Sequence, residues 1–146
     1  MKLSACLFAS AVAVIAICGS FAAGSARAAE DEEATAASLE LGEALFKERC
    51  AACHGEDATG NGPAAGAMRV APANLTEISK RASGKFPAVR VVEIITYGGD
   101  IAAHGSGPMP VWGRVFSEEG GRGKIGAARS RQAIIALKRY LESIQK

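Results

Sequence analysis

Cys50-Ala51-Ala52-Cys53-His54 is the stretch that decides how this chain folds and what it holds. Two thiols and one imidazole lie within little more than one helical turn of each other. Cys-x-x-Cys-His is the spacing at which haem is attached covalently, through two thioether bonds and one iron-ligating imidazole. The motif therefore predicts one covalent haem at Cys50, Cys53 and His54.

Two other chemistries use a Cys-x-x-Cys pair: a structural zinc site and a thioredoxin-like thiol pair. A four-ligand zinc site needs a second pair of ligands, and His104 is the only cysteine or histidine after His54. A thioredoxin-like pair stands at the head of a helix, whereas residues 40–49 read as a helix that precedes the motif. Haem is favoured, and a non-haem thiol redox protein stays open as the weaker alternative.

The N-terminus has the parts of a secretory signal peptide. Lys2 provides positive charge, residues 3–21 are almost wholly apolar, and Ala26-Arg27-Ala28 offers a small-residue cleavage site. We expect residues 1–28 to be removed and the mature protein to be periplasmic, without stable membrane insertion after cleavage. Export agrees with the motif, because bacterial haem c is attached outside the cytoplasmic membrane. An uncleaved anchor is the alternative, since the apolar stretch is just long enough to span a membrane.

Cleavage would change both the cysteine content and the charge of the chain. It would remove Cys6 and Cys18, so that no cysteine remains outside the haem motif and no disulfide is expected. It would also remove two of the 17 basic residues, which leaves as many basic as acidic residues and no indication of nucleic-acid binding. Acidic residues dominate in 29–68 and basic residues in 69–146. This uneven distribution of charge along the chain is typical of solvated surface or of a basic docking patch for a redox partner.

The mature chain is predicted to form one domain over residues 38–146, after a disordered lead-in at the acidic, alanine-rich residues 29–37. Ser38 can cap a helix that runs into the haem motif, and residues 129–144 read as a second, amphipathic helix. Gly42 is unusual inside the first helix. A mid-helix glycine costs about 1 kcal/mol relative to alanine unless something must approach closely.

Residues 89–97 are ambiguous, because their β-branched side chains favour a strand. Pro87 before them and Gly98-Gly99 after them are instead placed as at the two ends of a helix. The residues alone leave the two structures equally supported. Residues 55–74 and the stretch after Gly98 are rich in glycine and proline and are predicted to be loops.

An iron atom that His54 binds on one face has a second axial position, for which Met68, His104 and Met109 are the candidates. Met109 stands between two prolines, which stiffen the backbone and hold the thioether at low entropic cost. We therefore predict Met109 as the sixth ligand, with His104 as the runner-up. A labile or absent sixth ligand would instead make the protein a haem subunit or sensor that binds small gases or peroxide.

The order of these motifs resembles that of the class I, mitochondrial-type cytochromes c, and within that class the small bacterial periplasmic members. The resemblance spans nearly the whole mature chain and rests on Gly-x-x-x-Phe-x-x-x-Cys-x-x-Cys-His at 42–54, Gly62-Pro63, Met109-Pro110-Val111-Trp112-Gly113, and a terminal helix with Leu137 and Tyr140. It implies an all-α fold around one covalent haem c. In that fold the first and last helices cross, and residues 89–97 are helical.

The same resemblance implies roles for individual residues. Cys50 and Cys53 would bind the haem vinyl groups, with His54 as proximal and Met109 as distal ligand. The carbonyl of Pro63, or in its place that of Pro72, would accept a hydrogen bond from the second ring nitrogen of His54. Trp112 would pack beside the haem edge, where its indole N–H reaches a propionate, or in the core.

Protein ligands on both faces of the iron leave no vacancy for a substrate, so the expected function is one-electron transfer and not catalysis. The expected partners are redox proteins such as a dehydrogenase, reductase or oxidase, bound by transient docking. The protein would be a free carrier or the cytochrome subunit of an oxidoreductase complex. Residues 117–131 are long for a minimal member of the class and form a candidate partner-specific surface.

Overall fold

The computed structural model describes residues 13–98 and 109–146. The chain divides into two compact units between Ala36 and Ala37. In the first unit, the described residues 13–36 are helical. Across the described ranges, no helix has both the length and the apolarity that crossing a membrane requires.

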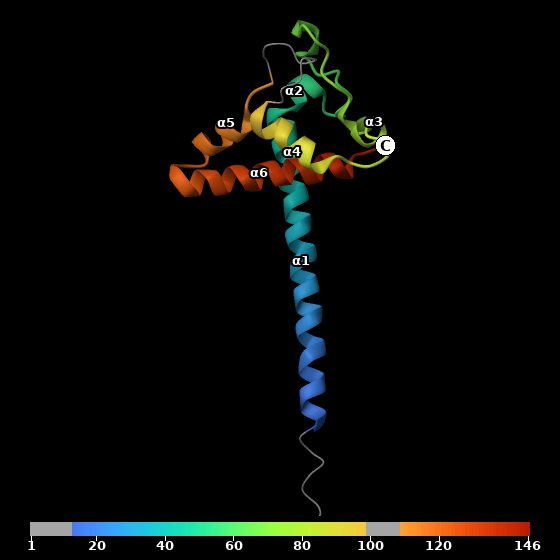
Figure 1. Cartoon of the computed structure of the whole chain (residues 1–146), viewed down its shortest axis with the longest axis vertical. Helices are drawn as coiled ribbons and strands as arrows, with labels where there is room; N and C mark the ends of the chain where they lie inside the picture. Colours follow the sequence, from blue (N-terminus) through green and yellow to red (C-terminus); the bar gives the residue numbers. More distant parts are fainter. Residues whose placement is uncertain (1–12, 99–108) are drawn as a thin grey trace, which may run out of the picture. The chain divides into compact units, whose positions relative to one another are not determined.

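The second unit confirms the predicted all-α fold, since its described residues form helices and loops and none lies in a strand. Figure 1 shows the elements along the chain. They are α1 (Ala13–Arg49), of which the last part belongs to this unit, α2 (Ala51–His54), the 3-10 turns η1 (Ala65–Ala67) and η2 (Leu75–Glu77), α3 (Ile78–Arg81), α4 (Ala88–Tyr97), α5 (Trp112–Glu119) and α6 (Gly123–Ser143).

Helix α1 begins well before the position that the sequence predicted. Residues 29–37 continue this helix instead of forming a disordered lead-in, and Ser38 is an interior residue instead of a cap. Alanine and glutamate are among the strongest helix formers, and no glycine or proline interrupts residues 29–37. Local helix propensity therefore accounts for the difference.

The last part of α1 crosses α6, and Gly42 lies at the crossing (Figure 1). A Cβ atom on Gly42 would clash with the Ala136 carbonyl oxygen and lie 2.8 Å from the Tyr140 Cβ, so only glycine allows this approach. One turn later the rings of Phe46 and Tyr140 pack with centroids 5.3 Å apart. Phe46 and Leu137 are fully buried here. The helix crossing that the resemblance implied is confirmed.

Residues 89–97 are helical and lie within α4. Gly98 ends this helix in the left-handed conformation, with φ of 81°, and its N–H donates to the Ile94 carbonyl. Val91 and Ile95, one turn apart, are the buried residues of the helix. Burial along one helical face has outweighed the strand propensity of the β-branched side chains.

Residues 117–131 form the end of α5, a short turn and the first part of α6. The second predicted helix therefore begins at Gly123 and not at Arg129. At Gly126, a Cβ atom would clash with the Ser117 carbonyl oxygen, so glycine allows α6 to approach α5 closely. Gly126 thus serves helix packing, whereas Gly121 and Gly123 adopt positive φ values of 113° and 62° at the turn between the helices.

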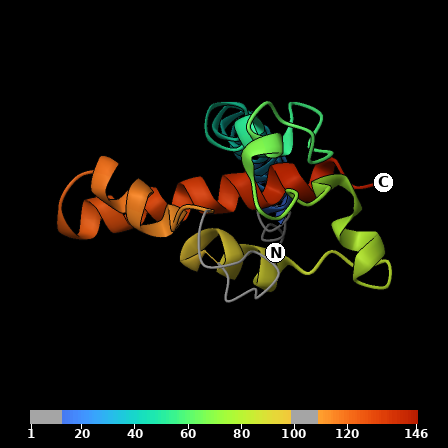
Figure 2. The same ribbon diagram turned by 90° about the horizontal axis from the view of Figure 1, so that it is seen from above.

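Helix α6 supports the other elements of this unit. Figure 2 shows the end of α1 with α2 on one side of α6, α4 on the other side, and α5 alongside its N-terminal half. Gly113 of α5 packs against the backbone of Thr96 on α4. Ser130 of α6 is buried and donates its hydroxyl to the Gly113 carbonyl at 2.9 Å. The segments that carry the predicted haem ligands are thus held in place by elements that pack against α6.

Candidate haem-binding site

A largely apolar cavity of about 390 Å³ lies between α2 and the start of α5. Its volume is within the range of about 300–1,000 Å³ that is usual for cofactor sites. The predicted site residues on its wall are Cys50, His54, Met109 and Trp112, and the helix crossing adds Phe46 and Leu137. A smaller adjoining cavity of about 70 Å³ shares the four site residues and adds Cys53. The fold has gathered the haem motif and the late methionine around one space.

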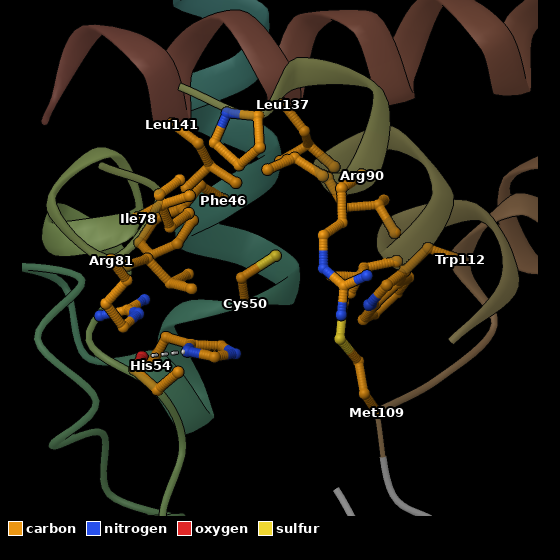
Figure 3. A pocket seen from close by; sticks show the side chains of 17 residues that line it. Phe46, Cys50, His54, Ile78, Arg81, Arg90, Met109, Trp112, Leu137 and Leu141 are labelled. Atoms are coloured by element: carbon orange, nitrogen blue, oxygen red, sulfur yellow. Dashed lines mark hydrogen bonds between the residues drawn. The ribbon is translucent and has the colours of Figure 1, made fainter. Parts of the chain in front are cut away.

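His54 ends α2, and its ring enters the larger cavity from one side (Figure 3). The Nδ1 atom lies 3.0 Å from the Ala73 carbonyl oxygen. When Nδ1 carries the proton, it donates to this carbonyl, and Nε2 then carries the lone pair that a metal ion requires. The bond also orients the ring, as is usual for histidine ligands of metals.

The carbonyl that holds His54 belongs to Ala73, which corrects the roles expected of Pro63 and Pro72. The turn that contains Pro63 is bonded to the backbone of α2 instead. The N–H groups of Gly62 and Ala64 donate to carbonyls of that helix at 3.1 and 2.8 Å. These bonds hold the turn against the backbone of α2. The chain comes within hydrogen-bonding distance of the His54 ring only at the following segment, which contains Ala73.

That segment, residues 72–75, is held against the loop that follows α2. The Leu75 N–H donates to the Ala58 carbonyl at 2.7 Å, and the Gly60 N–H donates to the His54 carbonyl at 2.7 Å. Gly60 has a φ of 92°, and a Cβ atom there would clash with the backbone of this segment. The glycine is the one sequence signal that marks the close approach.

Cys50 and Cys53 are free thiols in this structure. Burial raises the pKa of the Cys50 thiol to about 12, with a smaller contribution from the neighbouring Cys53. Nucleophilic cysteines of redox pairs have lowered pKa values, because the thiolate is the reactive form. The raised pKa of Cys50 is the opposite of this pattern, so it gives the thiol redox alternative no support.

Met109 lies across the cavity from His54 (Figure 3). It is partly buried and packs against the hydrophobic core. Trp112 is the first residue of α5, is 9% exposed, and stacks on Phe116 with ring centroids 5.5 Å apart. The packing of α5 thus positions the segment that carries Met109.

The other two candidates for a sixth ligand are placed differently. Met68 lines the smaller cavity and not the larger one. His104 lies outside the described residues. Within the described ranges, Met109 is the candidate that lies opposite His54 on the larger cavity.

Three polar groups on the cavity wall were not found by sequence reasoning: the Ala73 carbonyl and the side chains of Arg81 and Arg90. A backbone carbonyl such as that of Ala73 carries no side-chain signature. The two arginines reach the cavity only because α3 and α4 pack beside it. A cation one residue before the buried Val91 is the signal that could have drawn attention to Arg90.

The donor set suits a covalent haem. Cys53 and His54 lie in α2 and Cys50 directly precedes it, and the thioether of Met109 lies opposite His54 across apolar walls. Within the described ranges, no three side chains of His, Cys, Asp or Glu are grouped so that they could hold a metal ion by themselves. The zinc alternative gains no support from this arrangement.

An all-helical fold around an apolar cavity, with Cys-x-x-Cys-His on one side and a methionine on the other, defines a class I c-type cytochrome. The family described as cytochrome C oxidase, cbb3-type, subunit III matches residues 37–122, more than half of the chain, and the chain belongs to this family. No curated protein and no solved structure matches the chain. The protein is thus a c-type cytochrome whose cofactor is covalent haem c, and its chemistry is haem-based electron transfer.

Proposed function

We propose that this protein is a periplasmic one-electron carrier with one six-coordinate haem c. Cys50 and Cys53 would hold the haem covalently, and His54 and Met109 would ligate its iron. The observation that supports this best is that His54 and Met109 lie on opposite sides of one apolar cavity (Figure 3). A haem between them has a protein ligand on each face, so no coordination position remains for a substrate.

The two cysteines are suited to thioether formation. Each thiol S–H adds across the C=C bond of one vinyl group. The sulfur atom forms a covalent bond to one vinyl carbon, the hydrogen atom is transferred to the other carbon, and no oxidant is consumed. Cys50 lines both cavities and Cys53 the smaller one, so the two sulfur atoms would attach one edge of the haem.

The bound haem supplies the one-electron iron couple, and the chain sets its potential. The thioether of Met109 favours the reduced state, and so does the apolar wall that keeps water away. The Ala73 carbonyl acts in the other direction, because a hydrogen bond from Nδ1 raises the basicity of the His54 ring. Ligand choice and burial are therefore the contributions of the protein.

Redox proteins are the partners that this chemistry requires. We infer that they bind by transient docking, and that the basic residues of 69–146 contribute electrostatic steering. A fixed cytochrome subunit of an oxidase complex is the second candidate, because the family description is that of an oxidase subunit. Size-exclusion chromatography of a native extract separates the two, since a fixed subunit elutes with a larger enzyme.

We further propose that residues 1–28 are a signal peptide that is removed after Ala28. The charged start, the apolar stretch and the Ala-Arg-Ala site support this. The intact mass of the purified haem protein tests it. A mass that begins at Ala29 supports export with cleavage, and a mass that retains the apolar stretch supports the anchor.

The decisive experiment is an absorption spectrum of the protein expressed with c-type maturation machinery, oxidised and reduced. We expect low-spin c-type bands together with the weak far-red band of methionine bound to ferric iron. Haem without that band would contradict Met109 ligation and favour a sensor with a labile sixth position, which carbon monoxide binding to the reduced protein would reveal. No covalent haem at all would overturn the cytochrome function.

A further inference from the structure

Two arginines line the larger cavity, although most of its wall is apolar. They are Arg81 at the end of α3 and Arg90 in the first turn of α4. The other charged or titratable groups on this wall, among the described residues, are Cys50 and His54. The described wall thus carries two cations and no carboxylate. Both arginines are also exposed to solvent, which places them at the mouth of the cavity.

The two guanidinium groups have donors to spare. Arg81 donates from Nη2 to the Asn74 carbonyl at 2.7 Å, which uses one of its five N–H groups. Arg90 forms no hydrogen bond and no ion pair with the described residues. By contrast, Arg49 on the smaller cavity is paired with two carboxylates, at 3.1 Å each. The cations at the larger cavity are the ones that lack an acidic partner in the described ranges.

The arrangement of substituents on haem indicates that its two propionate carboxylates would lie at this cavity mouth. Haem carries its two vinyl groups on one edge and its two propionates on the opposite edge. Cys53 lines only the smaller cavity, whereas Arg81 and Arg90 line only the larger one. If thioether bonds held the vinyl edge at Cys50 and Cys53, the propionate edge would face away from the smaller cavity and toward the arginines.

The arginines also stand on different sides of the cavity. Figure 3 shows Arg81 on the side of His54, and Arg90 on the side of Met109 and Trp112. A guanidinium group binds a carboxylate through two parallel charge-assisted hydrogen bonds, which a lysine cannot reproduce. Two carboxylates at the mouth would thus each find one such group.

We propose that Arg81 and Arg90 bind the two propionates of the haem, one from each side of the cavity mouth. This assignment rests on the proposed haem site at Cys50, Cys53 and His54. Arg81 is in addition a positioning residue for His54. The carbonyls that hold Arg81 and His54 belong to two consecutive residues, so a propionate on Arg81 is linked to the segment that orients the ligand.

The test compares haem-loaded R81Q and R90Q with R122Q. Arg122 is an exposed arginine at the start of α6, lines neither cavity, and its loss removes the same charge. Midpoint potentials and the propionate bending bands of the resonance Raman spectrum are measured. R81Q and R90Q are each expected to lower the potential and shift the bands, because a nearby cation stabilises the less positive, reduced iron. R122Q leaves the bands in place and changes the potential less.

R81K and R90K separate charge from geometry. They are expected to keep the wild-type potential and still shift the propionate bands, because lysine retains the charge but not the planar fork. If a glutamine variant does not load haem, the corresponding lysine variant is compared with the wild-type protein and R122Q in its place. The assignment would be overturned if the midpoint potentials and the propionate bands of all four variants matched those of R122Q. The arginines would then remain as docking residues. Absence of covalent haem from the wild-type protein would instead overturn the proposed function, so the two failures are distinguishable.

Discussion

The two sides of the cavity are built in different ways. On the His54 side, hydrogen bonds hold the backbone of the ligand. The backbone N–H of His54 donates to the Cys50 carbonyl at 2.9 Å, and the backbone carbonyl of His54 accepts from the Gly60 N–H at 2.7 Å. On the Met109 side the ligand is a thioether, a weak acceptor whose position depends on how α5 packs against α4 and α6. The backbone of His54 is therefore fixed by bonds close to the motif in sequence, whereas the position of Met109 depends on tertiary packing.

The His54 side is also held by the C-terminus. The Gln145 side chain accepts from the Ser79 N–H at 2.8 Å and donates to the Leu75 carbonyl at 2.8 Å. These bonds hold the start of α3 and the turn η2, which directly follow the segment of Ala73. The orientation of the histidine thus depends on a residue that lies at the opposite end of the domain sequence.

The largest effect is expected from removal of both thiols. Replacing Cys50 and Cys53 by alanine should abolish covalent haem, because denaturation leaves only the thioether bonds to hold the cofactor. A haem stain of a denaturing gel measures this. The control, C53A, keeps one thiol and is expected to retain stain. Haem that stays with the denatured double variant would contradict the attachment site.

Loss of Met109 should affect the iron without releasing the haem. M109A is expected to keep the haem stain, lose the far-red band and have a lower midpoint potential, since the sulfur ligand favours the reduced state. M68A is the matched control, because Met68 lines only the smaller cavity and is expected to leave both quantities unchanged. If M109A retained the band while M68A lost it, the two methionines would exchange roles.

Loss of Gln145 should weaken the His54 side by an intermediate amount. Q145A leaves the Ser79 N–H and the Leu75 carbonyl without their partner and is expected to lower the free energy of unfolding by about 1–3 kcal/mol. Denaturant unfolding followed by circular dichroism measures it. Q132A, at an exposed position of α6, is the control. Equal stability of the two variants would show that the C-terminus does not support this side.

The smallest effect concerns pH and the loop after His54. The Asp57 carboxylate accepts from the N–H and hydroxyl of Thr59 at 3.1 and 2.9 Å, and these bonds lower its pKa. A pKa below the unfolded value stabilises the fold at neutral pH, and this stabilisation is lost as pH falls through the folded-state pKa.

The Asp57 contribution therefore declines in the acid range below about pH 4, where an unperturbed aspartate takes up its proton. The Tm of the wild-type protein should fall faster in that range than the Tm of D57N. Melting curves between pH 6 and pH 3 measure the difference. Parallel pH profiles of the two proteins would show that the Thr59 bonds do not stabilise the carboxylate.

Where the sequence predicted structure well, the signal was local. The haem motif, the glycine at the helix crossing and the glycine after Tyr97 each place a constraint on their immediate neighbours. Where the signals were balanced, as in residues 89–97, contacts with α5 and α6 decided the outcome in favour of a helix. At residues 29–37, polar composition predicted disorder, and helix propensity prevailed.

By itself, the sequence determined the class of protein and its cofactor, because covalent haem attachment needs only two thiols and an imidazole at a short, fixed spacing. Only the tertiary structure decided that Ala73 holds the His54 ring, and that Arg81 and Arg90 share a cavity with it. Every residue offers a backbone carbonyl, and any surface helix can carry an arginine. Which of them reaches the haem site depends on contacts between segments that are far apart in the chain.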